Sequence, residues 1–373
     1  MDTVLVVGAG IIGSAVALEL HRRGARVTVL ESASEGGQTS VASAGMVNPF
    51  SLTPEENPAL PFAIESRRQF PEWVASLKAL TGIDAEWRAE GGLCVALTPG
   101  DRAHLQRMLA WVVRYEPSAR LLSDQEVRQL EPALTEQCLG GLWLPSEGWV
   151  HTERLMRALH QALRQSGVAL ERGRPAIGFA TEGRRVVGVR TATGTLYADA
   201  VVLCAGAWAS MLADTLGISI PIEPLRGQVL VLRDLPQGVG RLLVSPIGYL
   251  VPQADGSALF GATRERVGYD TRVTAEGVET LLSRFLQLFP RMVDATLMGF
   301  KVGLRPNTPD HQPLISALPH WDGLYLACGH SYHGILLAPA TAAAVADLVR
   351  HGATSLPIEP FKPERFEKHE VNR

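Results

Sequence analysis

The feature that most constrains the fold is the pattern Gly8-x-Gly10-x-x-Gly13 near the start of the chain. Residues 3–7, directly before it, form an unbroken apolar run, which is typical of a strand buried in a parallel sheet. Residues 14–23, directly after it, have helical character. A glycine turn between a buried strand and a helix is typical of nucleotide-binding α/β domains. The sequence therefore predicts an α/β fold with a Rossmann-like domain at its beginning.

A second strand over residues 27–30 ends on Glu31 and completes a strand–helix–strand unit of about 30 residues. Glycines let the backbone approach a pyrophosphate, and the N-terminus of the following helix favours its negative charge. Glu31 can accept hydrogen bonds from ribose hydroxyls and would repel a 2′-phosphate. The unit thus favours NAD or FAD over NADP, and the alternative is a glycine turn without a ligand.

The segment that follows favours FAD over NAD. A nicotinamide dehydrogenase would normally continue with alternating strands and helices, whereas residues 38–46 read Gln-Thr-Ser-Val-Ala-Ser-Ala-Gly-Met. We expect a small, hydroxyl-rich loop that packs against a long cofactor, or else an ordinary surface loop. A further buried strand over 201–204 leads into Ala205-Gly206-Ala-Trp208, which fits either a cofactor contact or plain core.

Nucleotide-type segments occur at the start, the middle and the end of the chain, so a second domain is inserted between them. We predict an FAD-binding domain from residues 1–47, 151–222 and 302–373. Residues 48–150 and 223–301 then form an α+β substrate domain on a mixed or antiparallel sheet. We expect helices over 67–80, 102–111, 152–165, 274–289 and 336–350, with Thr152 as a cap. We expect further strands over 92–97, 168–171, 186–190, 195–198 and 324–327, and antiparallel strands within 225–263.

Composition excludes several classes of function. The net charge of −3 gives no reason to expect nucleic acid or an anionic membrane as a partner. Four scattered cysteines lack metal-type spacing, which favours reduced, buried thiols and no metal site. The apolar runs 4–18 and 335–346 are interrupted by glycines and by a proline, respectively, and predict neither a signal peptide nor a membrane span. We expect a soluble, cytoplasmic protein, and a homo-oligomer stays open.

Two further segments carry candidate chemistry. Arg305 lies between apolar residues and a proline in the turn-rich segment 303–310. A guanidinium can bind a carboxylate with two parallel hydrogen bonds, and the alternative is a structural salt bridge. The loop at Gly329-His330 leads to a helix whose N-terminus would stabilise negative charge on a flavin, the alternative being an ordinary capped helix.

Taken together, these segments resemble the D-amino-acid oxidase superfamily of flavoproteins, and within it most closely the glycine oxidases of thiamine biosynthesis. The resemblance covers essentially the whole chain. Its most specific pieces are Ser43-Ala-Gly-Met46, Gly261-Ala-Thr263, Val267-Gly-Tyr-Asp270, Thr274-Ala-Glu-Gly277, Gly303-Leu-Arg-Pro306, Thr308-Pro-Asp310 and Gly334-Ile-Leu-Leu-Ala-Pro-Ala-Thr341.

The resemblance implies roles for single residues. Arg305 would bind the substrate carboxylate, Tyr249 would add a hydrogen bond, and Met46 would line the site. Tyr332 stands where the family has arginine, and Arg264 stands where it often has methionine. Arg264 would either point into the site or, as we favour, be a solvated loop charge. The residues expected to bind FAD are Gly8, Gly10, Ile11, Ile12, Gly13, Glu31, Ser32, Thr39, Ser40, Ser43, Ala44, Gly45, Met46, Ala176, Ala205, Gly206, Trp208, Arg305, His330, Tyr332, His333, Gly334, Ile335 and Leu336.

The resemblance also implies a reaction. Hydride would pass from the α-carbon of glycine, sarcosine or a small D-amino acid to the flavin, and oxygen would become hydrogen peroxide. No side chain need act as a general base. Sarcosine-oxidase relatives tether their flavin through a cysteine where this chain has Gly303, so we expect non-covalent FAD. The alternatives are a dehydrogenase that reduces a quinone, an RNA-modifying FAD oxidoreductase domain and a non-catalytic nucleotide-binding protein. The RNA-modifying domain would need a basic groove, and no Lys/Arg cluster in the sequence indicates one.

Overall fold

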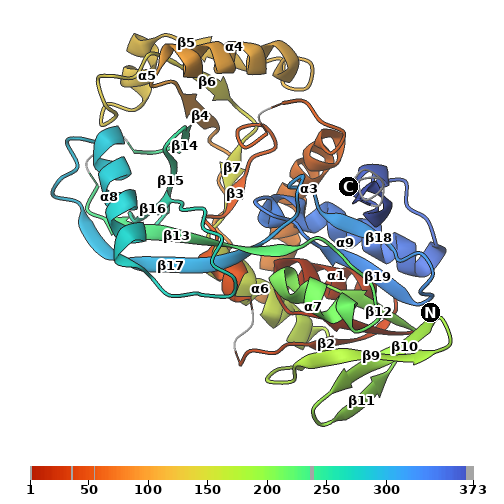
Figure 1. The fold of residues 1–373 in the computed structure, drawn as a ribbon. Coiled ribbons are helices and arrows are strands. Elements are labelled where there is room, and N and C mark those ends of the chain that lie inside the picture. Colours follow the sequence, from red (N-terminus) through yellow and green to blue (C-terminus); the bar gives the residue numbers. More distant parts are fainter. Residues whose placement is uncertain (1, 35–36, 54, 236–238, 367–373) are drawn as a thin grey trace, which may run out of the picture.

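The computed structural model describes residues 2–34, 37–53, 55–235 and 239–366. Its first sheet has six strands in the order β18-β19-β12-β1-β2-β8 (Figure 1). The strands from β19 to β8 are parallel, and β18 joins the edge in antiparallel orientation. The strands are β1 (Thr3–Val7), β2 (Arg26–Leu30), β8 (Ala169–Glu171), β12 (Ala200–Leu203), β18 (Leu314–Ala317) and β19 (Leu324–Cys328).

Both faces of this sheet are buried, as the apolar run of β1 predicts. Val4 and Val6 belong to a core shared with helices on one face. Leu5 and Val7 belong to a second core on the other face, where a three-stranded sheet and α7 pack. The helices of the first face are α1 (Ile11–Arg22), α3 (Leu60–Thr81), α6 (Thr152–Gln165) and α9 (Gly334–His351). The elements of the second are β9 (Ala176–Glu182), β10 (Arg185–Thr191), β11 (Gly194–Tyr197) and α7 (Ala209–Asp214).

The second large sheet has eight strands in the order β17-β13-β16-β15-β14-β4-β6-β5, and Figure 1 shows it extending away from the first. It is mixed, because β14 and β4 are parallel while its other pairs are antiparallel. The strands are β4 (Gly92–Val95), β5 (Arg120–Leu122), β6 (Gly141–Leu144), β13 (Glu223–Arg233), β14 (Leu242–Ser245), β15 (Gly248–Pro252), β16 (Ala258–Gly261) and β17 (Thr296–Asn307). Helices α4 (Pro99–Val112), α5 (Asp124–Leu130) and α8 (Ala275–Leu288) and the short turns η1 (Gly206–Trp208) and η2 (Glu359–Phe361) complete the fold.

Three local expectations differ from the structure. Residues 38–46 are not a plain loop, because they form helix α2 (Gln38–Ala42) and enter β3 (Met46–Val47), which pairs with β7 (Gly148–Trp149). The segment 303–310 is not turn-rich throughout, because residues 303–307 complete β17, where β13 supplies the partner strand. Thr152 begins α6, and His151 takes the capping position.

The α/β fold and the mixed second sheet are confirmed. The six-stranded sheet draws its strands from the predicted FAD-binding segments, and the eight-stranded sheet draws them mainly from the predicted substrate segments. Strand β17 crosses the predicted boundary at 301/302, so the two parts share it. Residues 367–373 of the last predicted segment lie outside the described residues. The division into two domains remains our proposal.

The buried carboxyl group of Glu147 makes the free energy of unfolding depend on pH. Its side chain is 0% exposed, and its Oε1 accepts hydrogen bonds from the backbone N–H of Phe50 (3.1 Å) and Ser51 (2.7 Å). Among the described residues its Oε2 has no hydrogen-bond partner. Burial raises the pKa of Glu147 from 4.5 to about 7, against the opposing effect of those N–H groups and of Arg67.

We therefore expect Glu147→Gln to become more stable relative to the native protein as pH rises. A raised folded pKa means that the native chain loses stability between pH 4.5 and about 7, whereas glutamine does not titrate. The difference in unfolding free energy between about pH 5 and about pH 8 should be about 3 kcal/mol. Urea titrations at both pH values measure it. Glu136→Gln is the control, because that side chain is 79% exposed. An equal effect of Glu147→Gln at both pH values would contradict the shift.

Candidate active site

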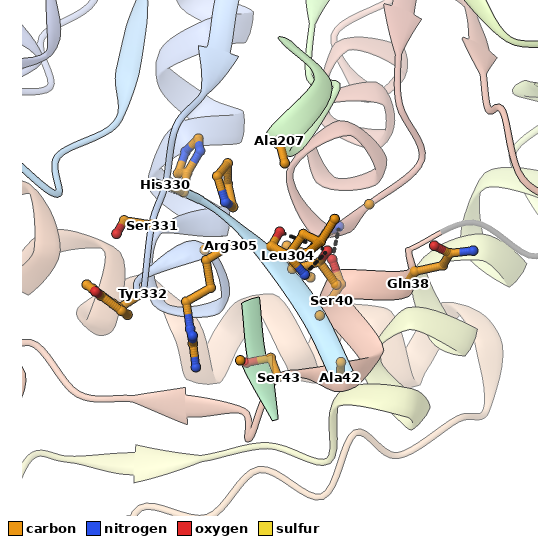
Figure 2. Close-up of a pocket in the computed structure, with 18 of the residues that line it drawn as sticks. Gln38, Ser40, Ala42, Ser43, Ala207, Leu304, Arg305, His330, Ser331 and Tyr332 are labelled. Carbon is orange, nitrogen blue, oxygen red and sulfur yellow. Dashed lines mark hydrogen bonds between the residues drawn. The ribbon is translucent and has the colours of Figure 1, made fainter. Parts of the chain in front are cut away.

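A cavity of about 970 Å³ lies where the two large sheets meet. Its wall is formed by the turn between β1 and α1, by α2, by the segment after β12, by β13 and β15 to β17, and by the loop before α9. Figure 2 shows side chains from these segments around it, with Gln38 and Ser40 on one side and Tyr332 on the other. Both the glycine motif and Arg305 line this one cavity, which therefore connects them.

The glycine motif shapes one end of this cavity by steric necessity. A Cβ on Gly8 would stand 2.5 Å from the carbonyl oxygen of Cys204, and one on Gly13 would stand 1.9 Å from that of Gly8. A Cβ on Gly10 would meet only Ser40 Oγ at 3.4 Å, so this side of the turn is open. Helix α1 has no side-chain cap from Gly10, and Ser40 Oγ takes the N–H of Ile11, so the positive end of the helix borders the cavity through the amides that follow Ile11.

Glu31 lies beside this turn and is 8% exposed. Its Oε2 accepts a hydrogen bond from the N–H of Ala9 at 2.8 Å, and its Oε1 accepts one from the N–H of Ala33 at 2.9 Å. Ser32 Oγ also donates to Oε1 at 3.3 Å, so these bonds fix the carboxylate in the cavity wall and leave a lone pair of Oε2 for a further donor. The arrangement suits a ribose with two hydroxyl donors and opposes a phosphate at the same place.

The hydroxyl-rich helix α2 connects the nucleotide end to β17. Ser40 Oγ accepts a hydrogen bond from the N–H of Ile11 at 3.0 Å, which holds α2 against the glycine turn. Thr39 Oγ1 donates to the carbonyl of Leu304 at 3.1 Å. A Cβ on Gly303 would stand 3.1 Å from Ala42 Cβ, so a side chain there would press on α2. The segment therefore packs closely against the glycine turn and β17 as a helix, and its predicted packing against the cofactor stays a prediction.

Arg305 reaches into the other end of the cavity from β17 (Figure 2). Its Nη1 donates to the carbonyl oxygen of Thr263 at 3.2 Å, and its guanidinium lies over Gly227 of the neighbouring strand. A Cβ on Gly227 would stand 2.3 Å from both terminal nitrogens. In the described part of the chain Arg305 has no carboxylate within ion-pair distance. The structural salt bridge considered above is thus not formed there.

Tyr249 lies in the same wall on β15, across Gly261 of β16. A Cβ on Gly261 would stand 2.7 Å from Tyr249 Oη, so the absence of a side chain there lets the ring lie flat on the sheet. Burial raises the pKa of Tyr249 above its usual value, while Arg305 and Arg264 oppose the rise. The neutral phenol can therefore donate a hydrogen bond next to the Arg305 guanidinium.

The two positions that depart from the family pattern both lie in the wall. The Tyr332 ring has the Arg305 guanidinium carbon 5.5 Å from its centroid and that of Arg264 at 5.0 Å. Arg264 is exposed, as a solvated loop charge would be, and it also lines the cavity.

The loop before α9 closes the cavity. His330 is 3% exposed, and its Nε2 is 3.1 Å from Thr341 Oγ1. Burial lowers the pKa of His330 to about 3, so the ring is neutral at ordinary pH. Helix α9 begins at Gly334 without a side-chain cap, and Gly334 and Ile335 line the cavity. Its free N-terminal amides can favour negative charge placed there.

Most residues predicted to bind substrate or cofactor share this wall: Gly8, Gly10, Ile11, Ile12, Glu31, Ser32, Thr39, Ser40, Ser43, Ala44, Met46, Ala176, Ala205, Gly206, Trp208, Tyr249, Arg264, Arg305, His330, Tyr332, Gly334 and Ile335. Gly13, Gly45, His333 and Leu336 lie outside it. Gly13 permits the tight turn, and a Cβ on Gly45 would stand 2.0 Å from the carbonyl of Val150. Leu336 is buried, and its carbonyl oxygen accepts a hydrogen bond from Ser66 Oγ.

Sequence reasoning missed other members of the wall, chiefly Gly227, Arg284, Leu52 and Ile247. Gly227 and Arg284 act from β13 and α8, where the sequence shows only ordinary strand alternation and helical periodicity. No local signal marks them. The pairing of β13 with β17 is what brings Gly227 under Arg305.

Residues 3–348 match the family model described as FAD dependent oxidoreductase, and the chain belongs to this family. It is 36% identical to the bifunctional protein ThiO/ThiG of Synechocystis sp. over 97% of its own length and 54% of that protein. It is 32% identical to the glycine oxidase of Pseudomonas putida over 97% of this chain and 98% of the other. The crystal structure of glycine oxidase from Geobacillus kaustophilus matches with a TM-score of 0.93, 32% identity and coverage of 98% and 99%.

The chain spans about half the length of the bifunctional relatives. None of the helices that the structure describes combines the length and the apolar character needed to cross a membrane.

The cavity fits the FAD that defines the family. Gly10 leaves open space beside the N-terminus of α1, Glu31 is fixed with spare acceptor capacity, and α2 lines the cavity between this end and β17. The residues that would hold FAD are those of the glycine turn, Glu31, α2 and the start of α9. When bound, FAD supplies a two-electron acceptor for a hydride.

We expect the FAD to be held without a covalent bond. Two cysteines, Cys204 and Cys328, line the cavity, but burial raises the pKa of Cys328 to about 12 and that of Cys204 well above its usual value. A thiol attacks as its thiolate, so neither is poised to form a link. Acid precipitation of the purified protein should leave yellow colour in the supernatant. Colour retained in the pellet would contradict this, and Cys204→Ser and Cys328→Ser would then locate the bond.

Proposed function

We propose that this chain is an FAD-dependent oxidase of glycine and of small amines or D-amino acids such as sarcosine and D-alanine. It would form the imino or 2-oxo acid and hydrogen peroxide. The observation that carries the proposal is Arg305, a guanidinium in the cavity wall with no carboxylate partner among the described residues. The likeness to glycine oxidases over nearly the full chain supports it. The proposal includes a role in thiamine biosynthesis, as the resemblance implies.

The residues at this end can position a small amino acid. Gly227 leaves room for both terminal nitrogens of Arg305, of which Nη1 donates to the carbonyl of Thr263. Arg305 can therefore bind a carboxylate through two parallel N–H···O bonds. The Tyr249 hydroxyl can donate a further hydrogen bond to the same carboxylate. Fixing the carboxylate at two points orients the α-carbon and limits which of its hydrogens can leave. One enantiomer is therefore excluded, since exchanging hydrogen for side chain would misplace the leaving hydride.

No acidic or basic side chain needs to take a proton here. Glu31 is the single acidic residue among the described residues of the wall, and it lies at the nucleotide end. The side chains of Arg264, Arg284 and Arg305 are cations that cannot act as bases at ordinary pH. The cationic wall disfavours a protonated substrate amine, so the amine would react in its neutral form.

We also propose that the predicted residues of the wall hold substrate and cofactor, and that the chain divides into the two domains given above. The protein would work in the cytoplasm, a location supported by its four unpaired, buried cysteines. Oxygen would be the electron acceptor.

Anaerobic titration of the flavin absorbance with glycine, sarcosine, D-alanine and L-alanine tests this function. The first three should bleach the flavin, and L-alanine should not. In air the same substrates should consume oxygen and form an equal amount of hydrogen peroxide. Bleaching without oxygen uptake would indicate a dehydrogenase, and a flavin reduced best by L-alanine would refute the assignment.

A further inference from the structure

The substrate end of the cavity carries more positive charge than a monocarboxylate needs. Arg264, Arg284 and Arg305 all line the wall, and none has a carboxylate within ion-pair distance in the described part of the chain. The two guanidinium carbons of Arg264 and Arg305 lie 5.0 and 5.5 Å from one Tyr332 ring, so they are at most 10.5 Å apart, the sum of these distances. Two cations held this close repel each other unless an anion joins them.

The lack of a partner for Arg264 contrasts with the arginines around it. Arg226 pairs with Glu265 and Asp270, so the carboxylates nearest to Arg264 in sequence are taken. Arg266 pairs with Glu223 at 3.0 Å, and Arg272 pairs with Asp270 at 2.9 Å. Of Arg226, Arg264, Arg266 and Arg272, only Arg264, which lines the cavity, is left without an acid among the described residues.

The backbone next to Arg264 is also in contact with Arg305. The carbonyl oxygen of Thr263, the residue before Arg264, accepts the hydrogen bond from Arg305 Nη1 at 3.2 Å. The positive charge of Arg264, 5.0 Å from the Tyr332 ring that Arg305 also contacts, opposes the rise in the pKa of Tyr249. A ligand whose first carboxylate is bound by Arg305 and Tyr249 therefore has a second guanidinium within reach.

We propose that Arg264 is a specificity residue that binds a second carboxylate, so that the preferred substrates are short dicarboxylic D-amino acids, represented by D-aspartate. This inference rests on the proposed function and names its substrate class. Arg305 holds the α-carboxylate, Arg264 binds the side-chain carboxylate, and Tyr332 packs against both guanidiniums. Arg284 adds positive potential that favours dianionic over monoanionic ligands.

Two matched ligand pairs test the proposal. Succinate and propionate differ only by the second carboxylate and lack an amine, so their binding to the FAD-loaded protein can be measured by titration of the flavin spectrum without turnover. We expect succinate to bind about tenfold more tightly, the effect of one hydrogen bond between charged groups. D-Aspartate and D-alanine form the corresponding substrate pair, compared by kcat/KM.

Arg264→Met keeps the bulk of the side chain over Tyr332 and removes its charge. This variant should lower the succinate-to-propionate affinity ratio about tenfold. It should lower the D-aspartate-to-D-alanine ratio of kcat/KM by the same factor. Arg264→Lys should restore part of both ratios. Arg266→Met is the control, because Arg266 pairs with Glu223 outside the wall and should leave both ratios unchanged.

The outcomes separate this inference from the proposed function. D-Alanine oxidation without any preference for succinate or D-aspartate, or ratios unchanged in Arg264→Met, would overturn the role of Arg264 and leave the oxidase intact. A flavin that no amino acid reduces would refute the oxidase, and the succinate titration would still decide whether Arg264 binds the second carboxylate.

Discussion

Replacing Arg305 with alanine is expected to lower kcat/KM for D-alanine by about 30-fold to several thousand-fold. This range corresponds to about 2–5 kcal/mol, the usual cost of removing one partner of a close, hydrogen-bonded charge pair. Arg305→Lys should recover only part of the loss, since an ammonium cannot offer two parallel N–H donors. FAD content should stay unchanged, because the glycine turn and Glu31 lie at the other end of the cavity. Steady-state kinetics and the flavin-to-protein absorbance ratio measure both effects.

Arg233→Ala is the matched control. Arg233 lies on β13, is 45% exposed, pairs with Asp255 and does not line the cavity. It should leave kcat/KM unchanged. Arg305→Ala with native kinetics would mean that the substrate carboxylate is bound elsewhere, and Arg264 would then be the first residue to examine.

Local sequence patterns predict the nucleotide end of the molecule well. The glycines, the apolar β1 and Glu31 all lie within one strand–helix–strand unit, so short-range periodicity and sterics fix their relation. The position of Ser40 follows less directly, because the same residues fit a loop or a short helix. The hydrogen bond from the N–H of Ile11 to Ser40 Oγ favours the helix seen here. The spacing of residues in the sequence does not predict this bond.

The substrate end is less predictable, because it is assembled by strand pairing across long sequence separations. Arg305 could be singled out as a charge between apolar residues, but its support comes from Gly227, 78 positions earlier. Tyr249 likewise depends on Gly261 of the next strand. Whether Arg264 points inward depends on which carboxylates its neighbours Arg226 and Arg266 take. Those pairings exist only in the folded chain.

Gly227→Ala is expected to lower kcat/KM for D-alanine about ten- to a hundredfold while the protein still folds and binds FAD. The new Cβ would stand 2.3 Å from both terminal nitrogens of Arg305. These atoms are the far end of a flexible side chain, so the guanidinium can move away and the backbone pairing of β13 with β17 can persist. A displacement of about 1 Å from the productive geometry is enough for such a loss in rate.

The double variant Gly227→Ala/Arg305→Ala decides whether the glycine acts through Arg305. If its role is to seat the guanidinium, adding Gly227→Ala to Arg305→Ala should cost nothing further, whereas independent effects would multiply. Gly240→Ala is the control, since nothing lies within 4 Å of a Cβ at that position. Thermal unfolding and FAD content show whether each variant is folded, and kcat/KM gives the coupling. A multiplicative loss in the double variant would mean that Gly227 serves the sheet or the cofactor, because the seating of Arg305 can be lost only once.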